Sequence, residues 1–530
     1  MLETKVDKIV MLVRKGPRVS FERLSKEVGL PVPIVERICQ ILERGQVLEI
    51  NYPVNVLERP FVVYKGIAPE KKPAESEGGK SISTYSFKAD NVPATVEIID
   101  SNREKFYRIS FVELTQETRV FLDYLKDELL KIVPAESSDV ADVERLAKVR
   151  ADFHALILKK LASFQLGDES TVLLAGLLLH SMFGLGQLDV LTHDDYLEEI
   201  AIINAKMPVG VYHRKFGWLK TNMFMPNEEE IFNYAAQIGR RVGRSIAVLT
   251  PIMDARLETG DRVNATLAPI SSHGNTITIR RFARNPWTIV SLINESAKTM
   301  TPEMAAMLWQ AIHYELNLIV AGGTASGKTS ALNALCAFIP PNQRVLTIED
   351  TRELILPKFV WNWIPLLTRN PNSEGLGEVA MLDLMVTSLR MRPDRIVLGE
   401  TRKKAEAEVL FEAMHTGHSV CSTFHADTST QVIRRLTTPP IEVPPSEIES
   451  LHLLLVQYRD RRRNLRRTLE ISEVQTGAQA ADLAPNIVYR WRPRTDTFDK
   501  VAEPVKLYKE LNLHTGMTKE DIIEDQKKVI

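Results

Sequence analysis

The sequence predicts an α/β protein of several domains, with a parallel-sheet domain in the C-terminal half. At 530 residues, the chain is too long for one hydrophobic core and is expected to divide into about three or four domains. From Leu316 onward, runs rich in β-branched residues alternate with helical patterns, as in LNLIVAG, RVLTIED, RIVLGE and SVCSTFHAD. Strands that alternate with helices indicate a parallel sheet covered by helices.

The composition excludes a global attraction to polyanions. Lys plus Arg (67) and Asp plus Glu (68) leave a formal charge of -1, so any attraction to nucleic acid or to an anionic bilayer has to be local. The three cysteines, Cys39, Cys336 and Cys421, lie far apart. This spacing argues against a disulfide framework and a cysteine zinc site, and it favours a reducing cytoplasm.

The most apolar stretch runs from Thr171 to Leu191, and polar or glycine residues interrupt it at His180, Gly184, Gly186 and Asp189. We expect a buried helix and turn there and no membrane span, and the N-terminus lacks the apolar core of a signal peptide.

Residues 1–66 are expected to form a winged helix-turn-helix module. VSFERLSKEVGL and IVERICQILERGQVLEI have helical apolar spacing on either side of a turn, and a β-ribbon follows. DNA binding through Arg37 and Arg44 is one interpretation, but the glutamates of the same helix would repel phosphate. We therefore favour a protein-docking or structural role over DNA reading.

Residues 67–85 are predicted to be a flexible linker, because IAPEKKPAESEGGKSIST has almost nothing to bury. A small α+β segment is expected over residues 86–139, with a β-hairpin in TVEIIDSNREKFYRISFVEL and a helix over 116–132.

An α+β domain is expected over residues 140–295. Its sequence begins with a helical segment over 140–183 and continues with strand-like runs around a helical pattern over 227–243. The remaining residues, 296–530, make up the parallel-sheet domain and its C-terminal extension.

The segment GGTASGKT satisfies the P-loop pattern between the apolar strand LNLIVA and the helix-like KTSALNALCAFI. Backbone N–H groups of such a loop and the helix N-terminus surround a phosphate. Lys328 supplies a cation to the phosphate oxygens, and the hydroxyl of Thr329 is suited to ligate Mg²⁺. The predicted phosphate-binding residues are Gly322, Gly323, Thr324, Ala325, Ser326, Gly327, Lys328, Thr329 and Ser330.

Acidic residues close two further strands. Glu349, Asp350 and Glu353 follow RVLTI, where a carboxylate can orient and polarise the attacking water. The alternative to a catalytic role is that these residues form a helix cap and a solvated turn. Taken alone, this segment favours the cap. Glu400 closes RIVLGE, where an acid can hold Mg²⁺ or its water.

Two histidines, His418 and His425, are expected at either end of the strand in GHSVCSTFHADT. No cluster of Cys or His accompanies them, so hydrogen bonding to phosphate, or sensing its loss, is favoured over zinc binding.

Taken in order, GGTASGKT, TIEDTRELILP, MRPDRIVLGETR and MHTGHSVCSTFHADT resemble the Walker A, Asp, Walker B and His boxes of the type II/type IV secretion ATPase superfamily. LTPIMDARLETGDRVNATLAP and TITIRRFARNP are similar to the N-terminal domain of that family. The resemblance is closest to the archaeal branch, which includes archaellum and pilus-assembly ATPases. Bacterial type II and pilus-assembly members usually carry a four-cysteine zinc module, and this chain, with three cysteines, has none.

The resemblance implies a RecA-like P-loop ATPase domain at the C-terminus, preceded by an α+β (PAS-like) domain, in a homo-hexamer that binds ATP and Mg²⁺. It implies a cytoplasmic ATPase, peripheral at the inner face of the membrane, that hydrolyses ATP to ADP and phosphate. Its partner would be a polytopic membrane platform protein of a type II secretion, type IV pilus or archaellum system, with filament subunits moved indirectly. Nucleic acid is not expected as a partner.

By the same resemblance, Glu349 is the catalytic carboxylate, Glu400 is the Walker B acid, and His425 is the second His-box histidine, with His418 as the first. Arginines of the preceding domain are expected to reach the γ-phosphate. Arg262 is the first choice. Arg281 and Arg256 are the alternatives, and for these two a structural role stays open.

Two other functions stay open. RecA-like motors also move DNA, so a nucleic-acid translocase is one, and an ATP-gated DNA-binding regulator is the other. The basic run YRDRRRNLRR could contact lipid or nucleic acid, but a charged hairpin or an ion-pair surface between subunits is favoured.

Overall fold

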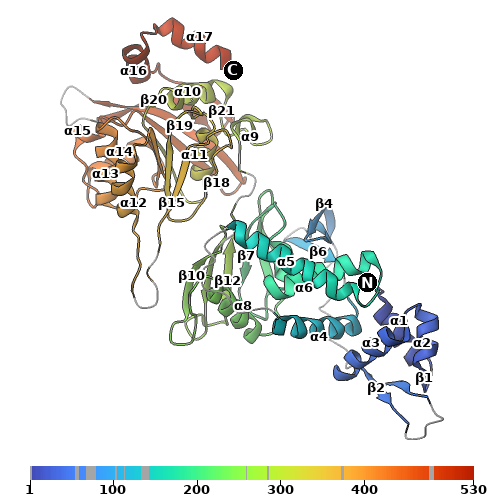
Figure 1. Ribbon diagram of the computed structural model, residues 1–530. Coiled ribbons are helices and arrows are strands. Elements are labelled where there is room, and N and C mark those ends of the chain that lie inside the picture. The colour runs from blue at the N-terminus through green and yellow to red at the C-terminus, as the bar shows by residue number, and fades with distance from the viewer. Residues whose placement is uncertain are drawn as a thin grey trace. The chain divides into compact units, whose positions relative to one another are not determined.

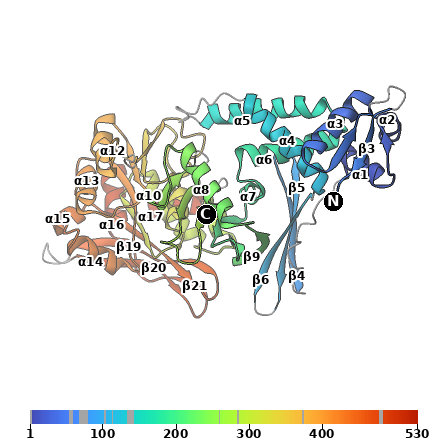
Figure 2. The same ribbon diagram turned by 90° about the horizontal axis from the view of Figure 1, so that it is seen from below.

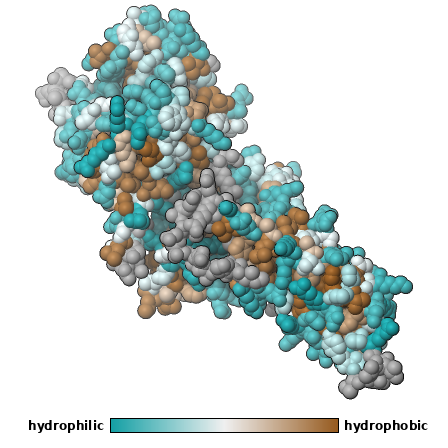
Figure 3. Space-filling view, viewed as in Figure 1, coloured by the Kyte–Doolittle hydropathy of each residue, from teal (hydrophilic) through white to brown (hydrophobic). Residues whose placement is uncertain are grey.

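The chain folds into two compact units (Figure 1), unit 1 over Met1–Arg281 and unit 2 over Phe282–Ile530. The computed structural model describes residues 3–529 apart from the segments 54–58, 67–78, 102–103, 113, 133–142, 258–259, 283–285, 370, 372–374 and 477–482. No helix in these described ranges is long and apolar enough to cross a membrane. The face seen in Figure 3 mixes hydrophilic and hydrophobic residues.

Unit 1 begins with three helices and a small antiparallel sheet of strand order β1-β3-β2. Their bounds are α1 (Lys5–Arg14), β1 (Val19–Ser20), α2 (Phe21–Val28), α3 (Val32–Arg44), β2 (Leu48–Asn51) and β3 (Phe61–Tyr64). The hydroxyl of Thr4 and the carboxylate of Asp7 cap α1 reciprocally, and Gly29 ends α2 in the left-handed conformation. The helices and β-ribbon expected over this segment are therefore present.

These helices share one hydrophobic core with three longer helices, which are α4 (Gln116–Ile132), α5 (Val143–Ala162) and α6 (Asp168–Phe183). The guanidinium carbon of Arg37 lies 4.6 Å from the ring centroid of Phe164, and Arg44 donates a hydrogen bond of 3.0 Å to the hydroxyl of Tyr124. Both arginines that were considered for DNA binding are thus used in packing within unit 1.

A mixed nine-stranded sheet completes unit 1, with strand order β10-β11-β12-β7-β8-β9-β6-β5-β4. Figure 2 shows its strands β4, β5 and β6 side by side. Its strands are β4 (Lys80–Ala89), β5 (Val92–Asp100), β6 (Lys105–Phe111), β7 (Leu197–Ile202), β8 (Pro208–His213), β9 (Gly217–Phe224), β10 (Ile252–Arg256), β11 (Arg262–Thr266) and β12 (Thr276–Arg280). Two helices accompany it, the short α7 (Gln187–Leu191) and the longer α8 (Glu228–Arg241), and the side chain of Asn227 caps α8.

Two expected boundaries are wrong in this unit. The linker expected over 67–85 ends earlier, because residues 80–85 already belong to β4, which pairs with β5; residues 67–78 of that prediction lie outside the described ranges. The segment 86–139 is also not separate from the domain that follows, since β6 pairs in parallel with β9. Strand pairing thus recruits β4, which its composition assigns to a linker, and joins β6 to a strand about a hundred residues later in the chain.

Unit 2 is built on a second nine-stranded sheet, of order β15-β14-β16-β17-β13-β18-β19-β20-β21. The strands from β15 to β18 are parallel, and β18 to β21 form antiparallel pairs. Their bounds are β13 (Leu318–Gly322), β14 (Val345–Glu349), β15 (Trp363–Leu367), β16 (Arg395–Leu398), β17 (Ser419–Phe424), β18 (Leu453–Asp460), β19 (Leu465–Thr476), β20 (Leu483–Arg492) and β21 (Thr497–Lys500).

Helices cover both faces of this sheet (Figure 1). In β13, Leu318 and Val320 join one core, while Ile319 and Ala321 join the other. The first core includes α9 (Ile289–Ile293), α10 (Pro302–His313), α11 (Lys328–Cys336), α16 (Lys506–Thr515) and α17 (Lys519–Val529). The second includes α12 (Met381–Ser388), α13 (Lys404–His415), α14 (Ser429–Thr437) and α15 (Pro445–Ile448). The parallel-sheet α/β domain predicted for this half of the chain is confirmed.

Candidate phosphate-binding site

The P-loop lies between β13 and α11, and its backbone adopts conformations that favour glycine. Gly322, Ala325 and Gly327 have φ angles of 152°, 58° and 96°. A Cβ atom at Gly322 would lie 2.4 Å from both the carbonyl oxygen of Gln457 and Oγ of Ser326. Only glycine fits at position 322, and the tight turn lets successive N–H groups converge at the start of α11.

Gly322→Ala is expected to destabilise unit 2 by more than about 3 kcal/mol, because left-handed strain and a backbone clash act together. Calorimetric unfolding of the full-length protein measures this loss. Gly417→Ala is the matched control, since Gly417 also has a positive φ, of 88°, but a Cβ there would meet nothing within 4 Å. Equal melting temperatures for the two variants would show that the clash at Gly322 has no effect.

Lys328 is the first residue of α11, and its side chain turns back over the loop. Its Nζ donates hydrogen bonds of 2.9 and 3.0 Å to the carbonyl oxygens of Gly322 and Gly323. Oγ of Ser326 is buried and has no hydrogen-bond partner among the described residues. The loop therefore combines a cation with polar groups at one place.

His425 follows β17 and reaches the same loop. Its Nε2 lies 3.1 Å from Oγ1 of Thr324. Burial lowers the pKa of His425, and the positive charge of Lys328 lowers it further, while the carboxylate of Glu400 acts in the opposite direction. The pKa of His425 is thus held below the usual value of a histidine, and both Lys328 and Glu400 act on it.

Glu349 ends β14 and is 2% exposed. Its Oε1 accepts the backbone N–H groups of Glu353 and Leu354, at 2.9 and 3.0 Å. Its Oε2 is buried without a partner in the described ranges. Burial raises the pKa of Glu349 to about 7. Glu349 therefore caps the following turn with one oxygen and keeps the other for a proton or a water molecule.

Glu400 lies two residues beyond β16 and is engaged by an arginine that sequence reasoning missed. Nε and Nη2 of Arg402 donate to Oε2 of Glu400 at 2.8 and 2.5 Å. Nη1 of Arg402 also donates to Oδ2 of Asp350 at 3.1 Å. Of Glu349, Asp350 and Glu353, the most deeply buried is Glu349, and Asp350 is ion-paired near the surface.

The P-loop, Glu349, Glu400 and His425 all lie at the carboxyl edge of the parallel strands. Strand order places β17 between β13 and β16, so the strand before Glu400 is two positions from the P-loop strand, about 10 Å at the usual spacing. Gly399 permits close approach there, because its Cβ would lie 3.2 Å from Cγ of Glu349. This is the edge at which open parallel sheets bind ligands.

His418 lies at the opposite edge. It precedes β17, and its Nδ1 is 3.1 Å from Oγ1 of Thr416, next to the C-terminus of α13. The phosphate contact expected for the two histidines is therefore geometrically available to His425 and not to His418.

A further arginine lies on the P-loop. Nε of Arg466, in β19, donates a hydrogen bond of 3.2 Å to the carbonyl oxygen of Ala325. Its run, 458–467, forms the antiparallel end of β18 and β19, which is the charged hairpin that the sequence favoured. In the sequence, Arg466 was marked only as one member of this basic run. The pairing of β18 with β19 places Arg466, and not another arginine of the run, against Ala325 of the P-loop.

The predicted arginines belong to unit 1. Nε and Nη2 of Arg262 donate to the two carboxylate oxygens of Asp254, at 3.1 and 2.6 Å, and Arg256 lies opposite Arg262 in the β10–β11 pair. The guanidinium of Arg281 donates to the carbonyl oxygen of Asp194. These contacts are all made within unit 1.

The residues of the site fit a nucleotide with Mg²⁺. A Cβ at position 322 would clash with the carbonyl oxygen of Gln457 and with Oγ of Ser326, so the loop depends on glycine there. The buried hydroxyl of Ser326 has no partner among the described residues. The hydroxyl of Thr329 and the carboxylate of Glu400 are hard oxygen donors, the kind that Mg²⁺ prefers.

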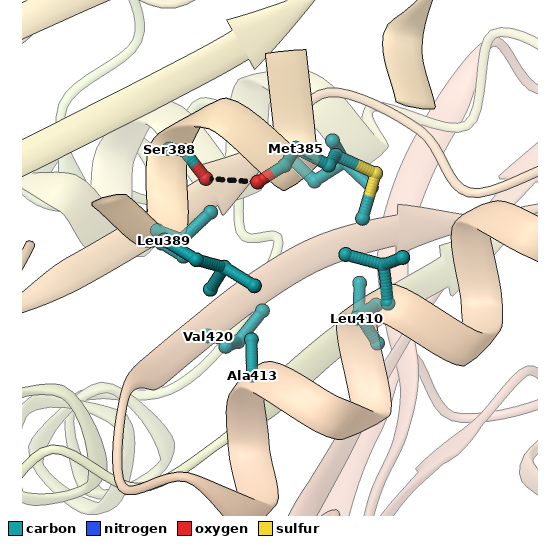
Figure 4. A pocket seen from close by; sticks show the side chains of 9 residues that line it. Met385, Ser388, Leu389, Leu410, Ala413 and Val420 are labelled. Carbon is teal, nitrogen blue, oxygen red and sulfur yellow. Dashed lines mark hydrogen bonds between the residues drawn. The ribbon is translucent and has the colours of Figure 1, made fainter. Parts of the chain in front are cut away.

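A small cavity lies elsewhere in unit 2 (Figure 4). It is lined by Met385, Ser388, Leu389, Ile396, Leu398, Val409, Leu410, Ala413 and Val420. Its hydroxyl, on Ser388, already donates to the carbonyl oxygen of Met385 at 2.7 Å. This lining is apolar and carries no charge, so it does not suit a phosphate.

Several known proteins are similar to this chain. "Uncharacterized protein MJ0900" and "Uncharacterized protein MJ0781" of Methanocaldococcus jannaschii are each 35% identical, over 66% and 72% of this chain. The alignments cover 66% and 52% of those two relatives. The type IV secretion system protein PtlH of Bordetella pertussis is 31% identical over 47% of this chain and 78% of its own length.

Among solved structures, the VirB11 ATPase of Brucella suis is 23% identical, with a TM-score of 0.27, over 55% of this chain and 96% of that one. The ATPase DotB of Yersinia pseudotuberculosis is 18% identical, with a TM-score of 0.40, over 66% and 86%.

The sequence profile of the family described as "Type II/IV secretion system protein" matches residues 228–462. That range contains the P-loop, Glu349, Glu400 and His425, which are the residues gathered at the carboxyl edge of the sheet. With the coverage of PtlH, the profile shows that this chain belongs to the type II/IV secretion system protein family.

Proposed function

We propose that this protein is an ATPase that hydrolyses ATP to ADP and phosphate and drives a secretion or pilus-type machine. The observation that carries the proposal is Glu349, a buried carboxylate with one oxygen held by backbone N–H groups and a pKa of about 7, on the same sheet edge as the P-loop. A carboxylate with that pKa is suited to accept a proton near neutral pH.

The residues of unit 2 have separate roles in this proposal. The loop N–H groups bind the phosphates, and Lys328 exchanges its two backbone carbonyl partners for phosphate oxygens. Glu349 orients the attacking water and takes its proton, and His425 contacts phosphate from the end of β17. Thr329 and Glu400 would hold Mg²⁺, which neutralises part of the phosphate charge when it is bound.

We assign the role of arginine finger to Arg262 first. Its guanidinium already forms a bidentate pair with Asp254, and a phosphate presents oxygens of the same geometry. Exchange of Asp254 for a γ-phosphate would couple hydrolysis to movement of unit 1. Arg281 and Arg256 are the alternatives.

The finer part of the proposal concerns assembly and partners. The protein forms a homo-hexamer at the inner face of the membrane, and each chain has a RecA-like unit 2 and a PAS-like α+β domain. Its partner is a polytopic platform protein that moves pilins, archaellins or secreted proteins. Residues 1–66 serve as a winged-helix docking module. The packing of Arg37 and Arg44 inside unit 1 supports docking over DNA reading.

ATP turnover by the full-length protein, measured as phosphate release with and without double-stranded DNA, tests the proposal. We expect measurable turnover that DNA does not change at low salt, where phosphate contacts are strongest. Turnover stimulated by DNA, with a steep loss on adding salt, would favour a translocase. Sequence-specific DNA binding without turnover would favour a regulator.

Recovery of the protein's partners from detergent-solubilised membranes tests the second half of the proposal. A polytopic membrane protein is expected among the partners of the full-length protein. Recovery of soluble proteins alone would contradict a platform partner.

A further inference from the structure

Unit 1 contains a cluster of ionisable side chains that the proposed ATPase does not use. His180 lies in the last turn of α6, Asp189 lies in α7, and His193 lies in the turn after α7. Ligand atoms of these three residues lie within 4.8 Å of one another. Asp90, in the turn between β4 and β5, faces the same space. The sequence showed His180 and Asp189 only as interruptions of an apolar stretch.

Backbone carbonyls fix one nitrogen of each imidazole ring. Nε2 of His180 lies 3.1 Å from the carbonyl oxygen of Ala89, and Nδ1 of His193 lies 2.9 Å from that of Asp189. A carbonyl only accepts, so these two nitrogens carry hydrogen. In neutral rings the other two nitrogens then hold lone pairs, which is the arrangement that outer hydrogen bonds impose on metal-binding histidines.

Each of the two remaining nitrogens faces a carboxylate oxygen. Nδ1 of His180 is 2.6 Å from Oδ2 of Asp189 and 3.8 Å from Oδ2 of Asp90. Nε2 of His193 is 3.7 Å from the same oxygen of Asp90. Tetrahedral ligands at about 2.0–2.2 Å from a zinc ion lie about 3.3–3.6 Å apart. These three distances lie on either side of that range.

Glycines allow both carboxylates to approach α6. A Cβ at Gly184, the residue after α6, would lie 2.4 Å from Cγ of Asp189. A Cβ at Gly176, within α6, would lie 2.4 Å from the carbonyl oxygen of Asp90. Close approach of the hairpin turn and of α7 to one helix is thus built into the backbone.

We propose that His180, Asp189, His193 and Asp90 bind a divalent transition-metal ion of the Zn²⁺ class. Two imidazoles and two carboxylates suit such an ion, and four protein ligands are typical of a structural site. The ion joins the β4–β5 turn to α6 and α7. The side chains of Asp90 and His193 are 27% and 18% exposed, which leaves the ion a path from solvent.

Arg150, on α5, supplies a positive charge to the cluster when no ion is bound. Its guanidinium is paired with Asp90 and lies 3.5 Å from Oδ2 of Asp189. Arg150 and a proton on His180 balance the two carboxylates in the metal-free state, because Nδ1 and Oδ2 at 2.6 Å need a proton or a cation between them. A divalent ion takes the place of that proton and is repelled by Arg150.

Metal titration of the full-length protein, treated with EDTA and free of nucleotide, tests the site. Zn²⁺ is expected to bind at one equivalent per chain by calorimetry, and Co²⁺ is expected to give the strong visible absorption of a tetrahedral site. His193→Gln should weaken Zn²⁺ binding by more than about 100-fold, and Arg150→Gln should strengthen it. His154→Gln is the matched control, since His154 lies one turn after Arg150 on α5, outside the cluster.

Each outcome decides the question. A wild-type protein that binds neither ion, or binding that His193→Gln leaves unchanged, would show that the cluster is an ion-pair network only. Circular dichroism of the metal-free variants checks their fold, and Asp90→Asn, at a partly exposed hairpin turn, repeats the test if His193→Gln is unstable. Because nucleotide is absent, failure here leaves the proposed ATPase untouched.

Discussion

Lys328→Ala is expected to lower ATP turnover by about 10³-fold or more. Nζ of Lys328 is held over the P-loop by the carbonyl oxygens of Gly322 and Gly323, so the ammonium is already in place for phosphate oxygens. A preorganised cation stabilises the charge that moves onto the leaving oxygens, and solvent does not replace it at the same position. Phosphate release at saturating ATP measures the loss.

Lys404→Ala is the matched control for this substitution. Lys404 is likewise the first residue of a helix of unit 2, α13, and it pairs with Glu442 at 3.3 Å, near the surface. It should keep the turnover of the wild type. Circular dichroism should show the same helix content in both variants. Wild-type turnover in Lys328→Ala would overturn the assignment of this loop as the phosphate site.

Glu349→Gln is expected to slow hydrolysis by about 10²–10⁴-fold while ATP still binds. The amide oxygen of glutamine can accept the N–H groups of Glu353 and Leu354 as the carboxylate does, so the turn after β14 is kept. What is lost is the oxygen that accepts a proton. Single-turnover hydrolysis and equilibrium binding of ATP, measured on the same preparation, separate these effects.

Asp350→Asn is the control, because Asp350 follows the same strand but is paired with Arg402 and accepts a hydrogen bond from Thr368. Its turnover should fall far less than that of Glu349→Gln. The reverse order of the two variants would move the catalytic role from Glu349 to Asp350.

The pH dependence of turnover follows from the same carboxylate. Burial raises the pKa of Glu349 to about 7, so the group is protonated below that pH and ionised above it. Only the ionised form accepts a proton, and kcat/KM should therefore rise with pH through about 7 and then level off. Glu349→Gln should lose this step. An unchanged step in the variant would assign the titration to another group.

Much of the site was predictable because its signals are local. GGTASGKT between an apolar strand and a helix predicted the turn, and three buried strands end at, or one or two residues before, the predicted Glu349, His425 and Glu400. Local pattern did not separate Glu349 from Asp350 and Glu353. Burial made that distinction, since it depends on what packs against the end of β14.

Other elements were missed because no local signal marks them. Apart from Ile82, the exposed positions of β4 carry polar residues, and the strand begins in a segment with the composition of a linker. It becomes a strand because β5 pairs with it. Nothing in the local sequence distinguishes Arg402 and Arg466 from the other arginines. The fold places Arg402 next to Glu400 and Arg466 next to Ala325.

The sequence by itself determined the α/β class of unit 2, the P-loop and the acidic strand ends. The hydrophobic periods of strands and helices, and the glycines of turns, depend on residues that are close in the chain. Only the tertiary structure decided that His425 and not His418 faces the P-loop, that Arg37 and Arg44 are occupied by packing, and that Asp90 meets His180 and His193. Those contacts join residues far apart in the chain, and strand order and burial select them after the local elements have formed.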